Sequence, residues 1–185
     1  MTSLMRLHDQ TIGGIARALD GWFLPTAARF VFAAVLLFYF WNSGLTKLGD
    51  GFLGFLSPSD NAYIQIFPKT VEALGYDTSQ LGAFHWLIAT AGTIAEFVLP
   101  FLIIVGLMTR LAAVGMIGFV IVQSIVDVQG HGISGQSLGG WFDGPSGSVI
   151  MDQRLLWVLL LMILFVKGAG PISLDRIFGK SPAAA

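Results

Sequence analysis

The chain has 185 residues, of which 55% are hydrophobic and 11% are charged, and its formal net charge is −1. Soluble domains usually carry about 25% charged residues, and a chain of this length has too small an interior to hide so much apolar surface. This composition excludes an ordinary soluble domain, favours a single integral membrane domain over residues 1–185, and gives no reason to expect a nucleic-acid partner.

The first predicted element is an amphipathic helix that precedes the first long apolar run. Apolar side chains recur there at near-helical spacing among polar residues: Leu4, Leu7, Ile12, Ile15 and Leu19. This pattern predicts a helix that lies on the membrane surface. Pro25 follows and is well placed to separate this helix from the first membrane span.

Four segments are long and apolar enough to cross a bilayer, whose hydrocarbon core of roughly 30 Å requires about 20 residues of helix. They lie near residues 26–45, 82–107, 109–128 and 149–167. Helices satisfy their own backbone hydrogen bonds in lipid, so the predicted fold class is all-α, an integral membrane four-helix bundle with an N-terminal amphipathic helix. The sequence leaves open whether the second span begins at Gly82 or a turn later.

The connections between the spans differ in length and composition. Residues 46–81 are apolar but interrupted by glycine and proline, which predicts a segment partly embedded at the interface, with short helices. Residues 130–147 are rich in glycine and are predicted to be irregular. Ser173 and Asp175 are expected to begin a short surface helix after the fourth span.

The basic residues predict how the bundle is oriented. With four spans both termini lie on one side, and that side receives seven of the ten lysines and arginines: Arg6, Arg17, Arg29, Arg110, Lys167, Arg176 and Lys180. The other side receives Lys47, Lys69 and Arg154. The positive-inside rule therefore predicts that both termini are cytoplasmic.

Glu96 is the one ionisable residue in the apolar run 87–107. An ionised acid near the membrane midplane costs on the order of 3 kcal/mol, so Glu96 should face the bundle interior and be protonated, paired or hydrated. His85, Ala89 and Gly92 share its helix face at steps of four and three residues. The two small residues among them allow a neighbouring helix to approach closely.

Other polar residues are expected in the outer half of the bundle near Glu96. Gln123 and Asp127 are four residues apart on one face of the third span, and Lys47 ends the first span. The candidate ligand-binding or proton-relay cluster is therefore Lys47, His85, Glu96, Gln123 and Asp127. Simple helix geometry places Lys47 well above Glu96, so the sequence does not predict that the two meet.

Several of these residues can also have a structural role instead of a functional one. Glu96 can be a buried acid paired with a basic side chain, Lys47 an anchor at the membrane interface, and His85 an ordinary interfacial residue. Asp152 and Arg154 are expected to cap and anchor the fourth helix. Structural or interface roles are assigned to four charged residues: Arg29, Arg110, Asp152 and Arg154.

Motifs for metal or covalent chemistry are weak. The chain has no cysteine, which excludes disulfides, thiolate metal ligands and thiol chemistry by the chain itself. The histidines, His8, His85 and His131, do not follow a metal-binding spacing. There is also no phosphate-binding loop and no nucleophile elbow. No metal site and no intrinsic cofactor are predicted, and catalytic residues stay unassigned.

The order of several motifs along the chain resembles the DoxX family of small four-span bacterial membrane proteins. The matching features, spread over roughly residues 26–178, are Arg29, Gly44 with Lys47, Ala95 with Glu96, Pro100, the stretches GLMTRLAA (106–113) and DQRLLW (152–157), and GAGPISLD (168–175). The order across four spans makes the resemblance specific, although no single motif does. It implies a location in the bacterial inner membrane.

The resemblance also implies a connection with quinone-linked oxidation, because relatives resemble a subunit of thiosulfate:quinone oxidoreductase. Other relatives are proposed to join membrane redox complexes with thiol-handling enzymes. We therefore expect a membrane-embedded, redox-associated subunit that binds a quinone or another lipophilic ligand and relays protons. Its partners would be the lipid bilayer, a protein that carries the redox centre and other copies of the chain. The alternatives are a structural membrane subunit without enzymatic activity and a carrier of small solutes or lipids.

Overall fold

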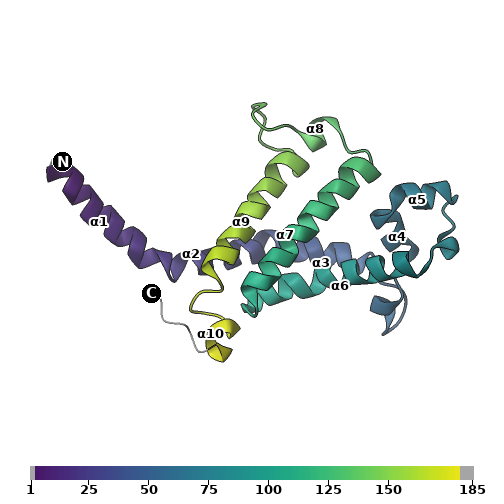
Figure 1. Ribbon diagram of the computed structural model, residues 1–185, viewed down its shortest axis with the longest axis horizontal. Helices are drawn as coiled ribbons and strands as arrows, with labels where there is room; N and C mark the ends of the chain where they lie inside the picture. Colours follow the sequence, from purple (N-terminus) through teal and green to yellow (C-terminus); the bar gives the residue numbers. More distant parts are fainter. Residues whose placement is uncertain (1–2, 180–185) are drawn as a thin grey trace.

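The computed structural model describes residues 3–179, with side chains from residue 5 onward. Within that range every regular element is a helix or a helical turn (Figure 1), which confirms the all-α prediction. Lys180 lies outside the described residues, as does the side chain of Leu4.

Four helices are long and apolar enough to cross a membrane: Phe23–Leu45, Ala83–Val105, Thr109–Gly130 and Val149–Lys167. They confirm the four predicted spans, and the second span begins at Ala83. Large apolar side chains such as Phe30, Leu111 and Leu156 are exposed on their outer faces, as a lipid-facing surface requires.

Three of the four spans contain a π-helical turn. The first consists of α2 (Phe23–Phe32), a π turn (Ala33–Leu37) and α3 (Phe38–Leu45), and the second is α6 (Ala83–Val105). The third consists of α7 (Thr109–Ile125) and a π turn (Val126–Gly130), and the fourth of a π turn (Val149–Gln153) and α9 (Arg154–Lys167). Such turns inside helices often mark functional sites, and the turn at Val126–Gly130 holds Asp127, a charged residue of the site described below.

A single apolar core joins the four spans. Phe32, Leu36 and Phe40 of the first span pack with Ile103 of α6, and α7 and α9 contribute the other large buried members: Met116, Val120, Leu161 and Leu164. Helix α7 packs beside both α6 and α9, while the first span packs against α9 through α2 and against α6 through α3. Figure 1 shows α7 and α9 running side by side. The four spans therefore close into a bundle.

The amphipathic helix is α1 (Ser3–Asp20), and Figure 1 shows it projecting from the bundle. Several of its apolar side chains are exposed: Leu7, Ile12 and Ile15 are 62%, 52% and 53% exposed. A turn at Gly21 and Trp22 separates α1 from α2. Pro25 lies in the first turn of α2, where its missing N–H group removes no helical hydrogen bond.

The two ends of the bundle are built differently. At the loop end, the connection between the first two spans folds into short helices: α4 (Asp60–Ile66), α5 (Pro68–Ala73), and two 3₁₀ turns at Gly54–Leu56 and Thr78–Gln80. Helix α4 packs on α6. The glycine-rich connection between the last two spans holds only the four-residue helix α8 (Gly135–Leu138).

At the opposite end, here called the terminal end, Arg29 ties the first span to two other chain segments. Its Nε donates a 3.0 Å hydrogen bond to the carbonyl of Ile103, and its Nη2 donates to that of Ile104. Its Nη1 donates to Ala169 at 3.1 Å and to Ile172. Both of these acceptors lie in the last turn of α6, where the Ile103 carbonyl also accepts the N–H of Gly106 and that of Ile104 has no helical partner. One guanidinium thus joins α2, α6 and the segment after α9.

The turn between α6 and α7 is held by the short helix α10 (Leu174–Phe178), whose N-cap is Ser173 as expected from the sequence. The carboxylate of Asp175 accepts the N–H groups of Met108 and Thr109 at 2.6 and 3.0 Å and so caps the start of α7. Gly106 ends α6 with φ +69°, and a Cβ there would lie 2.5 Å from the Cβ of Ser173. Only glycine fits this turn without a shift of its neighbours.

Candidate functional site

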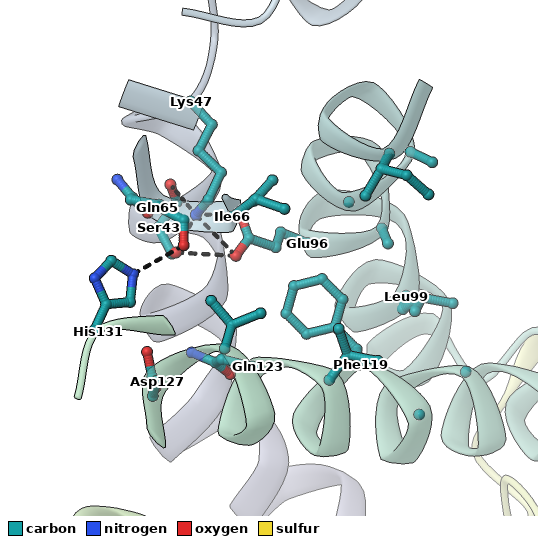
Figure 2. Close-up of a pocket in the computed structure, with 18 residues that line it drawn as sticks. Ser43, Lys47, Gln65, Ile66, Glu96, Leu99, Phe119, Gln123, Asp127 and His131 are labelled. Atoms are coloured by element: carbon teal, nitrogen blue, oxygen red, sulfur yellow. Dashed lines mark hydrogen bonds and ion pairs between the residues drawn. The ribbon is translucent and has the colours of Figure 1, made fainter. Parts of the chain in front are cut away.

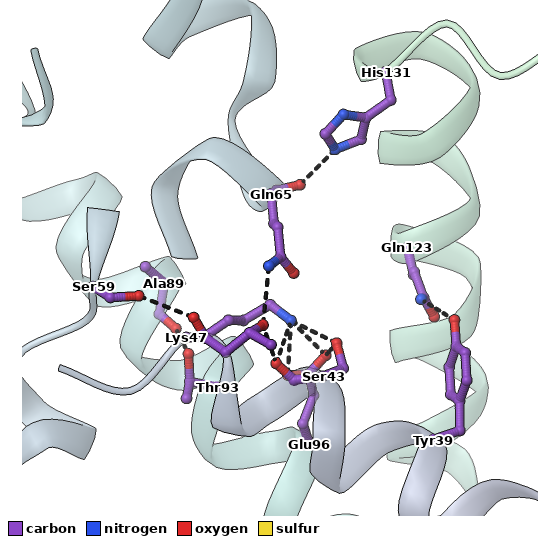
Figure 3. A network of polar contacts seen from close by, with 11 residues as sticks. Tyr39, Ser43, Lys47, Ser59, Gln65, Ala89, Thr93, Glu96, Gln123 and His131 are labelled. Carbon is purple, nitrogen blue, oxygen red and sulfur yellow. Dashed lines mark hydrogen bonds and ion pairs between the residues drawn. The ribbon is translucent and has the colours of Figure 1, made fainter. Parts of the chain in front are cut away.

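Lys47 and Glu96 form a buried ion pair between α3 and α6. The Lys47 Nζ lies 3.1 and 3.0 Å from the two carboxylate oxygens of Glu96, and the two residues are only 5% and 2% exposed. Ser43 lies between them: its hydroxyl contacts Glu96 Oε1 at 2.9 Å and accepts from Lys47 at 2.7 Å (Figure 3). The carboxylate in the apolar span is therefore paired and hydrogen-bonded.

The meeting of these residues corrects the expectation that Lys47 lies well above Glu96. The lysine side chain folds back along its own helix and also donates to the carbonyl of Ser43 at 3.2 Å. Helices α3 and α6 approach closely here, since a Cβ on Gly44 would lie 2.7 Å from the ring of Phe97. The first turns of α6 extend beyond the end of α3 and pack against α4 instead. Lys47, at the end of the first span, therefore lies at the same depth in the bundle as Glu96, in the middle of the second.

A second ion pair joins α7 to α9 at the loop end. The Arg154 Nη2 lies 2.5 Å from Asp127 Oδ2, and its Nη1 donates to the hydroxyl of Ser124 at 3.1 Å. Arg154 is 4% exposed, so it lies inside the bundle rather than at the membrane interface. Its guanidinium also lies 5.9 Å from the centroid of the Trp157 ring, within cation–π range. Arg154 thus holds the Asp127 carboxylate in place.

The remaining charged residues that were assigned structural roles lie at helix ends. Asp152 and Ser148 cap each other at the start of the fourth span, with N–H to side-chain distances of 2.9 and 3.2 Å. Arg110 donates to the carbonyl of Val166, near the end of α9, at 3.3 Å.

A cavity of about 400 Å³ lies between α6 and α7 and is bordered at the loop end by α3 and α4 (Figure 2). Most of its wall is apolar or small: Ile66, Ile88, Ala91, Gly92, Ala95, Leu99, Gly115, Gly118, Phe119, Val122 and Val126. Its polar side chains are Ser43, Lys47, Gln65, Glu96, Gln123, Asp127 and His131. An apolar chamber with a few convergent polar groups is the usual form of a small-molecule site.

The cavity has a lateral side that faces the bilayer. Its wall includes Ile88 of α6 and Val122 of α7, which are 38% and 59% exposed. Between these helices, a Cβ added at Gly118 would meet no atom within 4 Å. A lipophilic molecule can therefore enter from the membrane between α6 and α7.

Four of the five residues in the predicted cluster line this cavity: Lys47, Glu96, Gln123 and Asp127. His85 does not; its ring packs edge-on against Phe67 and Phe84, with centroids 4.9 and 5.8 Å away. It shares a helix face with Glu96, but it lies three turns closer to the loop end, beside the segment that holds α4 and α5. Its Nδ1 is buried and has no partner among the described residues.

Sequence reasoning missed three polar residues of the cavity. Ser43 had a usable signal, because it precedes Lys47 by one helical turn and so shares its face. Gln65 and His131 come from connections without periodicity, and no signal in the sequence places them. Gln65 donates to the Thr46 hydroxyl at 3.0 Å, and the Nε2 of His131 lies 3.0 Å from the carbonyl of Gln65. These contacts fasten α4 over the cavity.

The side-chain amide of Gln123 has a hydrogen-bond partner for its nitrogen but none, among the described residues, for its oxygen. Its Nε2 donates to the hydroxyl of Tyr39 at 2.9 Å, whereas its Oε1 is buried without a partner among residues 3–179. The two ends of an amide can exchange places, since the Tyr39 hydroxyl both donates and accepts. Gln123 can therefore offer either a donor or an acceptor to a molecule in the cavity.

Within the described part of the chain, no group of three His, Cys, Asp or Glu side chains is placed to hold a metal ion. The side chains around the cavity can instead hold a polar head group by hydrogen bonds, surround an apolar body, and exchange a proton at Glu96.

A comparison with protein families gives a match that covers more than half of the chain. The model of the family described as DoxX matches residues 24–127, which include Lys47, Glu96, Gln123 and Asp127. Neither the curated proteins nor the solved structures contain a match to the chain.

Proposed function

The chain belongs to the DoxX family, and we propose that it is a redox-associated membrane subunit that holds a quinone or another lipophilic ligand between α6 and α7. The observation that carries this proposal is the lateral cavity with buried charged groups in its wall. A purely structural bundle gains nothing from an open chamber beside Lys47 and Glu96, because the side chains that line unfilled volume lose packing contacts.

The residues present fit a quinone. The cavity volume of about 400 Å³ lies within the roughly 300–1,000 Å³ of small-molecule sites. A quinone presents carbonyl acceptors on a flat apolar ring, and it accepts electrons together with protons when it reacts. Gln123 can donate to such a carbonyl, while Leu99, Phe119 and Val122 surround the ring. The lateral side lets an apolar tail extend into the bilayer.

Glu96 is the group we propose for proton exchange. Ser43 and Lys47 hold its carboxylate at the cavity wall, so its orientation does not depend on the ligand. The surrounding apolar wall excludes bulk water, and a carboxyl group in such a place can hold or release a proton at one Oε atom. Asp127, held by Arg154, is a second carboxylate on the same cavity.

The proposed setting is the bacterial inner membrane, with both termini in the cytoplasm. Seven of the ten lysines and arginines favour this orientation. The electron donor would be a partner protein that carries the redox centre, and association with further copies of the chain is part of the same proposal. Whether the chain itself is catalytic depends on that partner.

One observation favours a structural subunit as the second candidate function. The Glu96 carboxylate already accepts hydrogen bonds from Lys47 and Ser43, so its charge is compensated without a ligand. On this alternative, Glu96→Gln lowers thermal stability or assembly, and the native protein binds no lipophilic molecule.

Titration with a short-tail quinone tests the proposed ligand. The ring of Trp157 lies 5.1 Å from that of Tyr39, the partner of Gln123, so tryptophan fluorescence can report binding. We expect saturable quenching in the native protein, and weaker binding in Glu96→Gln and Gly118→Leu. Gly118→Ala is the matched control and should bind normally, because one methyl group leaves the cavity open. Quenching that does not saturate, or that is equal in all variants, would contradict the proposal.

A further inference from the structure

A second cavity, of about 710 Å³, lies at the terminal end of the bundle, far from the ion pairs of the loop end. The start of α7, the end of α9 and the segment from Gly168 to α10 surround it, and Figure 1 shows these parts close together. Three basic side chains line it: Arg110, Lys167 and Arg176. They come from three different elements, so the fold, and not one local run of sequence, gathers them.

The positive charge of this cavity is only partly compensated. Asp175 is the one acid among its lining residues, and both of its oxygens already accept backbone N–H groups of α7. Lys167 pairs with Asp20 of α1 at 2.5 Å. Arg110 makes one long hydrogen bond, 3.3 Å to a backbone carbonyl. The side chain of Arg176 makes no hydrogen bond or ion pair with the residues that the structure describes. The two guanidinium groups therefore have donors to spare.

Apolar side chains next to the cavity lie on the lipid-facing surface. Met108, Leu111 and Val166 are 55%, 63% and 58% exposed. The cavity is located where the spans end, which is the depth of lipid head groups. The guanidinium group binds phosphate oxygens with two parallel hydrogen bonds, and basic pockets between spans are typical sites for anionic head groups.

We propose that this cavity binds the phosphate of an anionic phospholipid, held by Arg110, Arg176 and Lys167, with the acyl chains along Leu111 and Val166. The ion pair of Lys167 with Asp20 shows that an anionic oxygen fits beside this lysine. A soluble phosphate has the same oxyanion chemistry but no use for the adjoining apolar surface. The inference does not depend on the ligand of the α6–α7 cavity.

Native mass spectrometry of the full chain in mild detergent tests the proposal, with phosphatidylglycerol and phosphatidylcholine as probes. We expect the native protein to prefer phosphatidylglycerol. Removing a cation near an anionic lipid weakens binding by about fivefold, so Arg110→Gln with Arg176→Gln should weaken it by about 25-fold. Replacing both by lysine should restore most of the affinity. Lys69→Gln, an exposed cation of the loop end, is the matched control and should leave affinity unchanged.

Arg176→Gln is the variant least able to disturb folding, because its side chain has no partner among the described residues. Thermal unfolding in phosphatidylcholine nanodiscs identifies any variant that fails to fold, and the Arg176→Gln and lysine variants then carry the test. Unchanged phosphatidylglycerol affinity in the folded glutamine variants would overturn the proposal. So would equal affinity for phosphatidylcholine, or binding of inorganic phosphate as tight as that of the lipid, which would identify a site for soluble phosphates.

Discussion

The two ends of the bundle use charged side chains in different ways. At the terminal end, Arg29 and Asp175 are bonded to backbone groups at the ends of helices. At the loop end, Lys47 pairs with Glu96 and Arg154 with Asp127, so charge meets charge across helices. The cavity between α6 and α7 borders these pairs, and Gln123, His85 and Arg154 leave buried polar atoms without partners among the described residues.

This difference separates a structural role from a functional one. Groups that satisfy backbone carbonyls hold helices together and leave nothing free to bind. Groups that pair beside an open chamber remain available to a ligand, and incompletely satisfied polar atoms there require an explanation. Substitutions of Arg29 or Asp175 should therefore change stability, whereas substitutions of the charged groups beside the α6–α7 cavity should change ligand binding as well.

The largest loss is expected for Arg29→Ala. It leaves the part-buried carbonyls of Ile104 and Ala169 without a donor, at about 1–3 kcal/mol each, and also removes the hydrogen bonds to Ile103 and Ile172. The free energy of unfolding should fall by more than about 3 kcal/mol, measured by thermal or denaturant unfolding in detergent. Arg29→Lys, which can reach only some of these carbonyls, should be intermediate. A free energy of unfolding in Arg29→Ala equal to that of the native protein would contradict a stabilising role for Arg29.

A smaller loss, with a different signature, is expected for Lys47→Met. It leaves the Glu96 carboxylate without its cation. An unpaired buried charge costs about 3–5 kcal/mol, but protonation of the carboxyl relieves much of that cost, so the loss should stay below about 3 kcal/mol. The double variant with Glu96→Gln should recover most of that loss, because no uncompensated charge remains. Unfolding of the two single variants and the double variant gives the coupling energy. If the losses of the two single variants simply add in the double variant, Lys47 and Glu96 are not energetically coupled, which would contradict the ion pair.

Gly118→Leu should separate binding from stability. A Cβ at Gly118 meets no atom within 4 Å, and replacing a helical glycine gains up to about 1 kcal/mol in helix propensity. The melting temperature should hold or rise while ligand retention falls, because the longer side chain occupies the cavity. Gly118→Ala should share the stability gain and keep the ligand. Equal ligand retention in the two variants would show that the cavity is not the binding site.

The smallest effect is expected at Asp77, which is exposed and lies outside the spans. Hydrogen bonds from Ser79 and Gln80 lower the pKa of its carboxyl. A lowered pKa stabilises the folded state above the ordinary value, and this contribution is lost as the pH falls below about 4. Asp77→Asn should therefore lack this part of the acid sensitivity. Melting temperatures of both proteins between pH 7 and pH 3 should converge; a constant difference would contradict the assignment.

The fold was largely predictable from the sequence because span length and apolar composition are local properties. Each observed span overlaps its predicted range, and α1 and α10 occur where spacing and capping residues placed them. The family resemblance was likewise recognisable, because it depended on the order of motifs.

The site was only partly predictable because it depends on how helices cross. Lys47 reaches Glu96 through the close approach at Gly44, and periodicity does not reveal how far α6 extends past α3. The same limit applies to Arg154, which points into the bundle, and to His85, which packs against Phe67. Gln65 reaches the cavity only through the fold of α4.

A lipophilic ligand held in the α6–α7 cavity beside Glu96 should co-purify with the protein in mild detergent. Mass spectrometry of the small molecules retained by the native chain, Glu96→Gln, Gly118→Leu and Gly118→Ala detects it. We predict one retained lipophilic compound in the native and Gly118→Ala proteins, strongly reduced in the other two. No specific compound in the native protein, or equal retention in all four, would contradict the claim and favour a structural subunit.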